Sequence, residues 1–171
     1  MNFTIRPYEP ADADWLLQCQ VALQEHELAI HDPRLAQTRT APLPATHDYM
    51  KLFWQSIAEN QGVALIGEIG GQRRGLIAGH VVHAPWPMEV WDSSHYGYVS
   101  DIFVEPLARG SGLAQALLDA LAAHLHQVDP KLTRLRINVL AANEIARGAY
   151  EKAGFVPYEV MYERPLSGGG K

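Results

Sequence analysis

The stretch that decides the fold is Ile102–Leu118, which reads IFVEPLARGSGLAQALL. It begins with the apolar end of a predicted strand, Gly97–Val104, and continues through a turn that contains two glycines. Leucines at helical spacing then predict a helix over Gly112–Val128. A strand that leads through a glycine turn into such a helix, among further strands and helices, indicates a mixed α/β domain.

The turn between this strand and helix has the properties of an anion site. The first amides of a helix have no partner inside the helix, and the helix dipole is positive at that end. Gly110 and Gly112 allow a phosphate to approach the backbone closely. Arg109 adds a permanent positive charge, and Ser111 offers a hydroxyl or an N-cap. The turn therefore predicts a pyrophosphate cradle; the alternative is a glycine turn that only joins the two elements.

Two common phosphate loops are excluded. Gly112 is followed by Leu113 and Ala114, where a P-loop has lysine and then serine or threonine. The dinucleotide fingerprint needs a third glycine, and Gln115 occupies that place.

Outward from this stretch, alternating and helical patterns predict the other elements. Before the stretch, the predicted elements in chain order are a strand over Phe3–Pro7, a helix opening at Pro10 and Asp12, an irregular stretch with Pro33, Pro42 and Pro44, a helix over Thr46–Asn60, a hairpin of Val63–Ile69 and Gly75–His83, and a loop over Ala84–His95. After it come a strand over Leu135–Val139, a helix over Asn143–Ala153 capped by Gly154, and strands over Phe155–Tyr158 and Val160–Arg164.

Two motifs carry a family resemblance. Arg109, Gly112 and Ala114 match the pattern Gln/Arg-x-x-Gly-x-Gly/Ala, and Val104 and Pro106 precede it as a strand-end Val-x-Pro. Further along, a second set fits Asn-x-x-Ala-x-x-x-Tyr-x-x-x-Gly-Phe: Asn143, Ala146, Tyr150, Gly154 and Phe155. In this order and spacing, the chain resembles the GCN5-related N-acetyltransferases (GNAT) over Gly97–Phe155.

The resemblance implies a fold and a function. The fold is an α/β (α+β) domain with a mixed, mostly antiparallel sheet of about seven strands, about four flanking helices and two splayed strands that form the acetyl-CoA cleft. The function is transfer of an acetyl group from acetyl-CoA, as co-substrate, to a primary amine of a small molecule or a protein, by direct attack in a ternary complex. Dimers are common in the family, so the resemblance allows a homodimer, and the oligomeric state stays open.

The resemblance also implies roles for individual residues. Tyr150 protonates the departing thiolate. Backbone groups of the strand end pair with the pantetheine arm, the loop binds the pyrophosphate, and Asn143 contacts the arm. The cofactor-binding residues are then Ile102, Phe103, Val104, Arg109, Gly110, Ser111, Gly112, Leu113, Ala114 and Asn143.

Helix geometry agrees with this second motif. Asn143 and Tyr150 are seven residues apart, close to two helical turns, so they share a face. A tyrosine hydroxyl is protonated at neutral pH and can donate to a thiolate. The alternative for Tyr150 is a core aromatic residue with its hydroxyl at the surface. The alternative for the whole protein is a non-catalytic acyl-CoA-binding or sensor domain on the same fold.

The general base stays unassigned. Some family members place a glutamate where this chain has Tyr98 and Ser100. Strand alternation turns the neighbouring Asp101 to the face opposite Ser100, unless a bulge re-aims it, and a structural carboxylate is an equal alternative. Other candidates lie in the variable segments: Glu25, Glu27, Asp32, Glu89, Asp92 and His95.

The acceptor is expected to meet the Ala84–His95 loop. Trp86 and Trp91 offer aromatic faces there, and Glu89 and Asp92 offer negative charge suited to an ammonium group. No metal site is expected, because two histidine pairs, His80 with His83 and His124 with His126, do not share a face of their predicted elements.

Composition narrows the class of protein. The net charge is −5 and basic residues are scattered, which argues against a nucleic-acid partner. Cys19 is the sole cysteine, so no intramolecular disulfide forms, and it reads as a small buried hydrophobe. With no signal-like pattern in Met1–Pro7 and no bilayer-length apolar run, we expect no membrane partner and a cytoplasmic location. One domain over residues 1–166 and a flexible tail, Ser167–Lys171, are expected.

Overall fold

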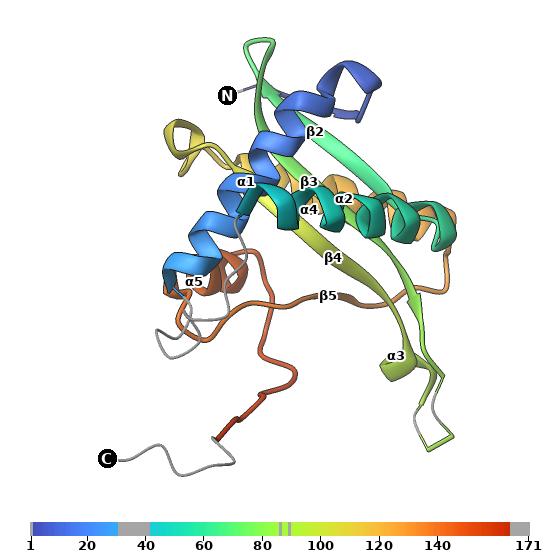
Figure 1. The fold of residues 1–171 in the computed structure, drawn as a ribbon. Helices are drawn as coiled ribbons and strands as arrows, with labels where there is room; N and C mark the ends of the chain where they lie inside the picture. The colour runs from blue at the N-terminus through green and yellow to red at the C-terminus, as the bar shows by residue number, and fades with distance from the viewer. Residues whose placement is uncertain (1, 31–41, 86, 89, 165–171) are drawn as a thin grey trace.

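A computed structural model describes residues 2–30, 42–85, 87–88 and 90–164, apart from the side chains of Pro42, Leu43 and Asp92. The described residues form one sheet in the order β1-β2-β3-β4-β5, with helices on both faces (Figure 1). The first three strand pairs are antiparallel and the β4–β5 pair is parallel, as expected for a mixed sheet. The strands are β1 (Phe3–Pro7), β2 (Val63–Ile69), β3 (Gln72–His83), β4 (His95–Val104) and β5 (Leu135–Ile137).

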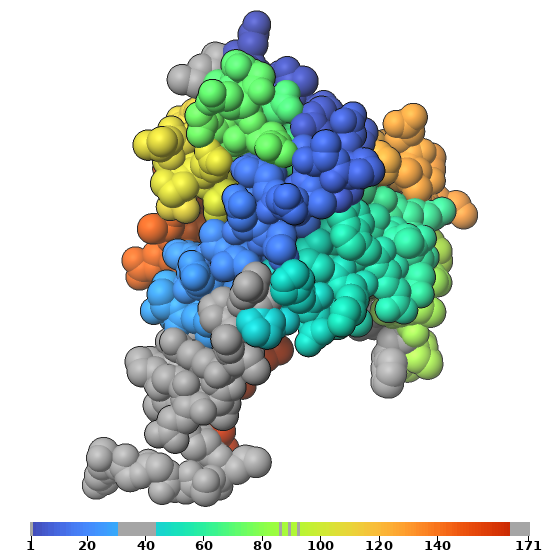
Figure 2. All heavy atoms as spheres, turned by 45° about the horizontal axis from the view of Figure 1, so that its top comes forward, coloured from blue at the N-terminus to red at the C-terminus, as the bar shows by residue number. Residues whose placement is uncertain are grey.

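The helices cover the sheet in two layers. α1 (Ala13–Ile30) and α2 (Pro42–Glu59) lie side by side on one face (Figure 2), and α4 (Leu113–Val128) packs on the other. The shorter helices are η1 (Pro10–Asp12), α3 (Trp91–Ser94), η3 (Pro106–Ala108) and α5 (Glu144–Lys152). Within the described ranges, none of the helices has the length and apolarity to cross a membrane.

The leucine stripe of α4 explains the tight packing of that layer. Leu113, Leu117, Leu121 and Leu125 are each at most 2% exposed. Glycines of the sheet face this stripe, and a Cβ added at Gly75 would lie 2.8 Å from Leu117 Cδ1. Only a residue without a side chain allows the helix so close to the strand.

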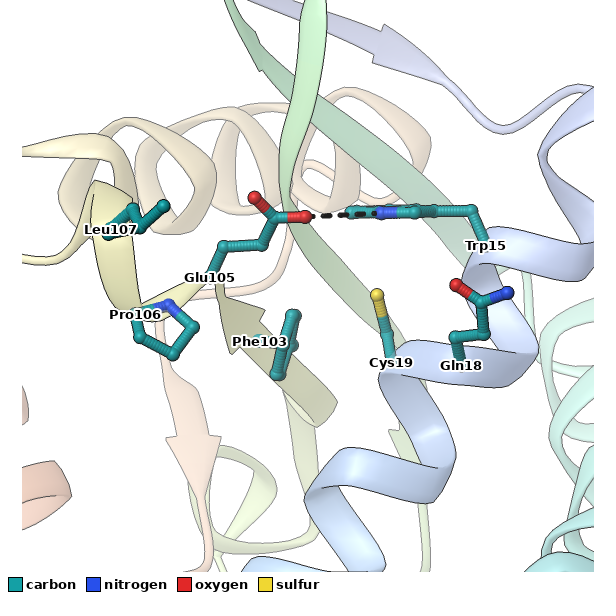
Figure 3. A pocket seen from close by; sticks show the side chains of 7 residues that line it. All are labelled: Trp15, Gln18, Cys19, Phe103, Glu105, Pro106 and Leu107. Atoms are coloured by element: carbon teal, nitrogen blue, oxygen red, sulfur yellow. Dashed lines mark hydrogen bonds between the residues drawn. The ribbon is translucent and has the colours of Figure 1, made fainter.

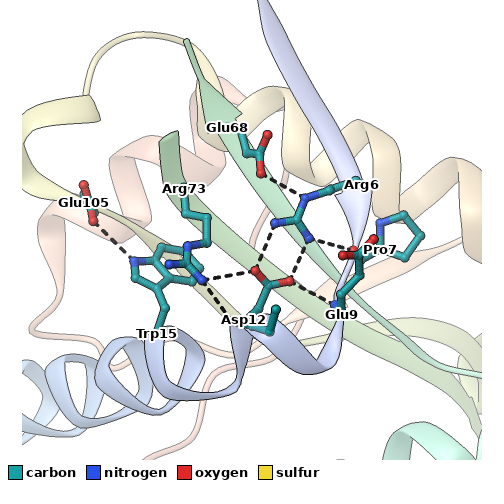
Figure 4. A network of polar contacts seen from close by, with 9 residues as sticks. Arg6, Pro7, Glu9, Asp12, Trp15, Glu68, Arg73 and Glu105 are labelled. Atoms are coloured by element: carbon teal, nitrogen blue, oxygen red, sulfur yellow. Dashed lines mark hydrogen bonds and ion pairs between the residues drawn. The ribbon is translucent and has the colours of Figure 1, made fainter. Parts of the chain in front are cut away.

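On the other face, an ion-pair network fixes the start of the chain (Figure 4). The carboxylate of Asp12, 2% exposed, accepts hydrogen bonds of 2.7 and 2.9 Å from Arg6 and one of 3.3 Å from Arg73. Arg6 also bonds Glu68 at 2.9 Å. The network therefore joins β1, η1, β2 and β3.

Several predicted boundaries shift. β4 begins at His95 instead of Gly97. α2 begins at Pro42, not Thr46, because the first turn of a helix needs no N–H donors and so accepts proline. β3 begins at Gln72, since Gly70 and Gly71 alone make the turn, with φ of 59° and 74°. β5 ends at Ile137, two residues before the predicted end.

The two predicted C-terminal strands are wrong. Residues 155–164 pair with no strand of the described chain, so the sheet has five strands instead of about seven. A strand needs a paired neighbour, and β5 offers an edge of only three residues. The Ser167–Lys171 tail lies outside the described residues.

Candidate functional site

The sheet opens between β4 and β5. These strands pair only where Gly97–Val99 meets Leu135–Ile137. Beyond that point β4 continues to Val104 without β5, paired with β3 on its other edge. A cavity of about 1030 Å³ lies in this gap, between Ser100–Val104 on one side and Ile137–Leu140 on the other. The expected pair of splayed strands is therefore present.

The glycine turn closes one end of the cavity. Arg109, Gly110, Gly112, Leu113 and Ala114 all line it. Gly110 and Gly112 have φ of 75° and 93°, a left-handed conformation that favours glycine. Gly112 is the N-cap of α4, so the unpaired amides of the first turn of this helix begin at the cavity.

Ser111 differs from its neighbours in the turn, because it does not line the cavity. Its hydroxyl donates to the carbonyl of Ala108 at 2.7 Å and accepts from the amide of Leu113 at 3.3 Å. Within the described structure, the side chain of Ser111 holds the turn in shape.

The second motif builds both ends of α5. Asn143 is the N-cap, and its Oδ1 accepts from the amide of Ala146 at 3.1 Å. At the other end Gly154 has φ of 87°, and the Phe155 amide donates to the carbonyl of Tyr150 at 3.0 Å. This is a Schellman C-cap, and the rings of Tyr150 and Phe155 contact each other at 6.0 Å between centroids. The predicted glycine cap is confirmed.

Asn143 and Tyr150 both line the cavity, as their seven-residue spacing predicts. Burial, with a smaller effect of the Glu27 charge, raises the pKa of Tyr150 to about 12. The hydroxyl therefore stays protonated at neutral pH and can donate a proton.

A β-bulge in β4 re-aims Asp101. Ala78 of β3 pairs with Asp101 while the next residue, Gly79, pairs with Val99, so Ser100 is the extra residue. The extra residue reverses the alternation of side chains along β4. As a result Asp101 points to the α1 and α2 side of the sheet and lines the cavity.

Helix α2 supplies a partner for this carboxylate. The hydroxyl of Tyr49 donates a hydrogen bond of 2.8 Å to Oδ2 of Asp101. Burial raises the pKa of Asp101 above the ordinary aspartate value, and the Tyr49 hydrogen bond opposes that rise. An aspartate with a raised pKa in a cavity is a stronger base than an exposed one.

Sequence reasoning missed this wall of the cavity. Tyr49 lies within the predicted Thr46–Asn60 helix, where nothing in the sequence marks it for the site, and 52 residues separate it from Asp101. Glu27 was one of several acids, and its charge acts on the pKa values of both Tyr49 and Tyr150. The cavity residues from α1 and α2 are Gln20, Leu23, Gln24, His26, Glu27, Thr46 and Tyr49.

The Ala84–His95 segment, which was expected to meet the acceptor, lies away from this cavity. Of its described residues, none lines the cavity. His95 instead bonds Asp129 at 2.7 Å and His83 at 3.2 Å, and it packs against Trp91 at the opposite end of β4. His95 is therefore not placed as the base. Trp86, Glu89, Asp32 and the Asp92 side chain lie outside the described structure.

A smaller hollow of about 410 Å³ lies beside the end of β4, lined by residues that include Trp15, Cys19, Phe103 and Glu105 (Figure 3). Cys19 is 3% exposed, and burial raises the pKa of its thiol to about 12, so it is a packing residue. Over the described ranges, no group of three or more histidine, cysteine, aspartate or glutamate side chains is placed to hold a metal ion.

A family model described as the acetyltransferase (GNAT) family matches residues 29–155. A search of curated proteins found no match.

Solved structures with the same fold were also found. Aminoglycoside 6'-N-acetyltransferase AAC(6')-Ih from Acinetobacter baumannii is 16% identical with a TM-score of 0.68, over 98% of this chain and 100% of that chain. A GCN5-related N-acetyltransferase from Ralstonia eutropha is 18% identical with a TM-score of 0.68; the match covers 97% of this chain and 100% of that chain. A predicted acetyltransferase from Clostridium acetobutylicum, solved with acetyl-CoA, is 20% identical with a TM-score of 0.67; the match covers 96% of this chain and 97% of that chain.

Proposed function

Because the chain belongs to the acetyltransferase (GNAT) family, we propose that it moves the acetyl group of acetyl-CoA to a primary amine by direct attack in a ternary complex. Family membership makes the protein an acetyltransferase and favours catalysis over a binding or sensor role. The observation that carries the proposed mechanism is that the glycine turn, Asp101 and Tyr150 line one cavity.

Two features of the cavity support acetyl-CoA as the co-substrate, which would supply a thioester reactive toward amines. A Cβ added at Gly110 would meet no atom within 4 Å, so there is room for a phosphate beside the backbone. The first-turn amides of α4 and the Arg109 guanidinium attract that charge. Beyond its last pairing with β5, the edge of β4 at Ile102–Val104 has room for an added strand-like arm of the cofactor.

Asp101 is the proposed general base. An amine attacks only in its neutral form, so the bound ammonium group must lose a proton, which Asp101 accepts. Tyr49 holds the carboxylate through the 2.8 Å hydrogen bond. The amine nitrogen then bonds to the acetyl carbon while the carbon–sulfur bond breaks.

Tyr150 is the proposed general acid. Its hydroxyl, with a pKa of about 12, donates a proton to the departing sulfur. The nitrogen of the bound ammonium group loses two protons on its way to the amide. Asp101 takes the first and passes it to solvent, and the second, which leaves the nitrogen after the attack, replaces the proton that Tyr150 gives to the sulfur. One proton is therefore released for each acetyl group transferred.

For the acceptor we propose a small-molecule cationic amine. Its charge would be met by Glu27 and Asp101, which line the part of the cavity walled by α1 and α2. The name of AAC(6')-Ih gives an aminoglycoside as the acceptor of that protein, which supports the class of amine and not its identity. The cytoplasmic location and the single domain over residues 1–166 stay predictions.

The test is a screen of amine acceptors in which released coenzyme A is detected as free thiol. Asp101→Asn should lower kcat by about 100-fold or more, while calorimetry shows unchanged affinity for acetyl-CoA. Asp14→Asn is the matched control, because Asp14 is exposed in the first turn of α1 and does not line the cavity. Full turnover by Asp101→Asn would remove Asp101 as the base, whereas absence of acetyl-CoA binding by the wild type would contradict the whole proposal.

A further inference from the structure

Helix α1 carries one polar side chain into the buried interior. Gln20 is 4% exposed, and it follows the core residue Leu16 by four positions, on the same face of the helix. Among the described residues, no group forms a hydrogen bond with its amide nitrogen Nε2, although this atom is shielded from water. Nearly all buried polar groups are paired, because an unpaired donor loses its hydrogen bonds to water and gains none. Such an exception points to a ligand.

Gln20 lies where α1 changes from core to cavity wall. Leu16 and Cys19 belong to the core between this helix, α2 and the sheet. Gln20, Gln24 and Glu27 follow at spacings of four and three residues, which keeps them on one face of the helix, and all three line the cavity. The unpaired amide therefore borders the space in which the proposed reaction occurs.

Ser100 supplies a second unpaired group, on β4. Its hydroxyl oxygen is buried and has no hydrogen-bond partner in the described part of the chain. Ser100 is the extra residue of the β-bulge, and it lines the same cavity. Burial raises the pKa of Asp101, and Tyr49, Ser100 and Gln20 each oppose that rise. Gln20 and Ser100 thus lie beside the proposed base, with hydrogen-bonding capacity left for a substrate.

The missing partner of Gln20 is an acceptor atom. The nitrogen of an amide side chain only donates, whereas the hydroxyl of Ser100 can donate as well as accept. An ammonium group has donors alone, so it pairs with the Asp101 carboxylate and leaves Gln20 unsatisfied. The acceptor atom has to lie close to the amine nitrogen, because Gln20 is beside Asp101. A carboxylate there would be repelled by Asp101 and Glu27, so the atom is an uncharged oxygen.

We propose that Gln20, together with Ser100, selects amines that carry a hydroxyl or ether oxygen on the carbon next to the one that bears the nitrogen. The inference rests on the proposed function, since that function places the reacting amine at Asp101. The ammonium charge is held by the carboxylates, and the neighbouring oxygen accepts from the Gln20 amide and the Ser100 hydroxyl. A plain alkyl amine leaves both donors unpaired in the complex and therefore binds more weakly.

The test compares two amines that differ in one atom. 2-Methoxyethylamine has an oxygen at the required place, and butylamine has a methylene there. Ligand-observed NMR titrations against the protein saturated with coenzyme A give a Kd for each amine without acetyl transfer. The wild type should bind 2-methoxyethylamine about tenfold more tightly than butylamine. Gln20→Met keeps the length of the side chain and removes the amide, so it should bring the two Kd values to within about twofold of each other.

Gln18→Met is the matched control, since Gln18 is exposed on the same helix and does not line the cavity. It should keep the ratio of the wild type. Ser100→Ala should lower the ratio in the same direction as Gln20→Met, so the test remains if the latter variant does not fold. Equal affinity of the wild type for the two amines, binding of neither, or an equal loss for both amines in Gln20→Met would overturn the inference.

This outcome is distinguishable from that of the proposed function. A protein that shows the expected ratio and binds acetyl-CoA, but acetylates no amine, would keep the oxygen-selective site and lose the proposed reaction. Acetyl transfer in the amine screen with equal Kd values for 2-methoxyethylamine and butylamine would keep the reaction and remove the role of Gln20.

Discussion

Tyr49 on α2 donates a 2.8 Å hydrogen bond to Asp101 on β4, so a helix from the first part of the chain holds the proposed base on the splayed strand. The bulge at Ser100 makes this contact possible, since it turns Asp101 toward α2. The groups that act electrostatically around this pair are His80, Tyr98 and Glu27.

Tyr49→Phe should move the acid limb of the kcat/KM profile to higher pH. The hydroxyl stabilises the ionised carboxylate, so its loss raises the pKa of Asp101 further. The carboxylate must be ionised to act as a base. As the pH is lowered, the variant therefore loses activity at a higher pH than the wild type does. A hydrogen bond worth about 1 kcal/mol corresponds to a shift of about 0.7 pH unit. Tyr8→Phe, which removes a hydroxyl beside Trp54, should leave the profile in place; equal profiles for all three proteins would deny Tyr49 this role.

Gly112→Asp should abolish binding of acetyl-CoA. The substitution puts a negative charge where the pyrophosphate is expected to meet the amides of α4. Because Gly112 has φ of 93°, any side chain is strained there, and Gly112→Asn is the control of nearly equal size without the charge. Calorimetry should show much weaker binding for aspartate than for asparagine at similar melting temperatures. Similar affinities for the two variants would place the cradle elsewhere.

Tyr150→Phe should lower the rate of the chemical step by about tenfold or more, at the low end for general acid catalysis because a thiolate leaves readily. The ring and its contact with Phe155 remain, so affinity for acetyl-CoA should stay near that of the wild type. Single-turnover kinetics are the measurement, since product release can mask the chemical step. Full single-turnover activity would make Tyr150 a packing residue.

Asp12→Asn should destabilise the fold by about 1–3 kcal/mol at neutral pH, because the buried carboxylate loses its charge-assisted hydrogen bonds with the partly exposed Arg6 and Arg73. Hydrogen bonds from Arg6 hold the pKa of Asp12 well below its usual value. This stabilisation is complete above the unfolded pKa of about 4 and is lost as pH falls below it. Denaturant titrations at several pH values should therefore show weaker acid destabilisation in the variant. Asp48→Asn, which breaks an exposed pair with Lys51, should match the wild type; a comparable loss there would point to a general charge effect.

The β-hairpin and the glycine turn were predictable from local chemistry. Val63–Ile69 and the two glycines after it specify a strand and a turn with positive φ, whatever surrounds them. The conformation of residues 155–164 was not predictable in this way. Val160 and Tyr162 have the propensity for a strand, but this segment pairs with no strand of the described chain.

The sequence alone determined the α/β class, the family, the turn at Arg109–Ala114 and the shared face of Asn143 and Tyr150, because each depends on residues close together in the chain. Only the tertiary structure decided that Asp101 faces the cavity, that Tyr49 holds it, and that His95 lies at the far end of β4. A single bulge reverses side-chain alternation, and a helix contact over 52 residues depends on packing. Neither leaves a periodic signal in the sequence.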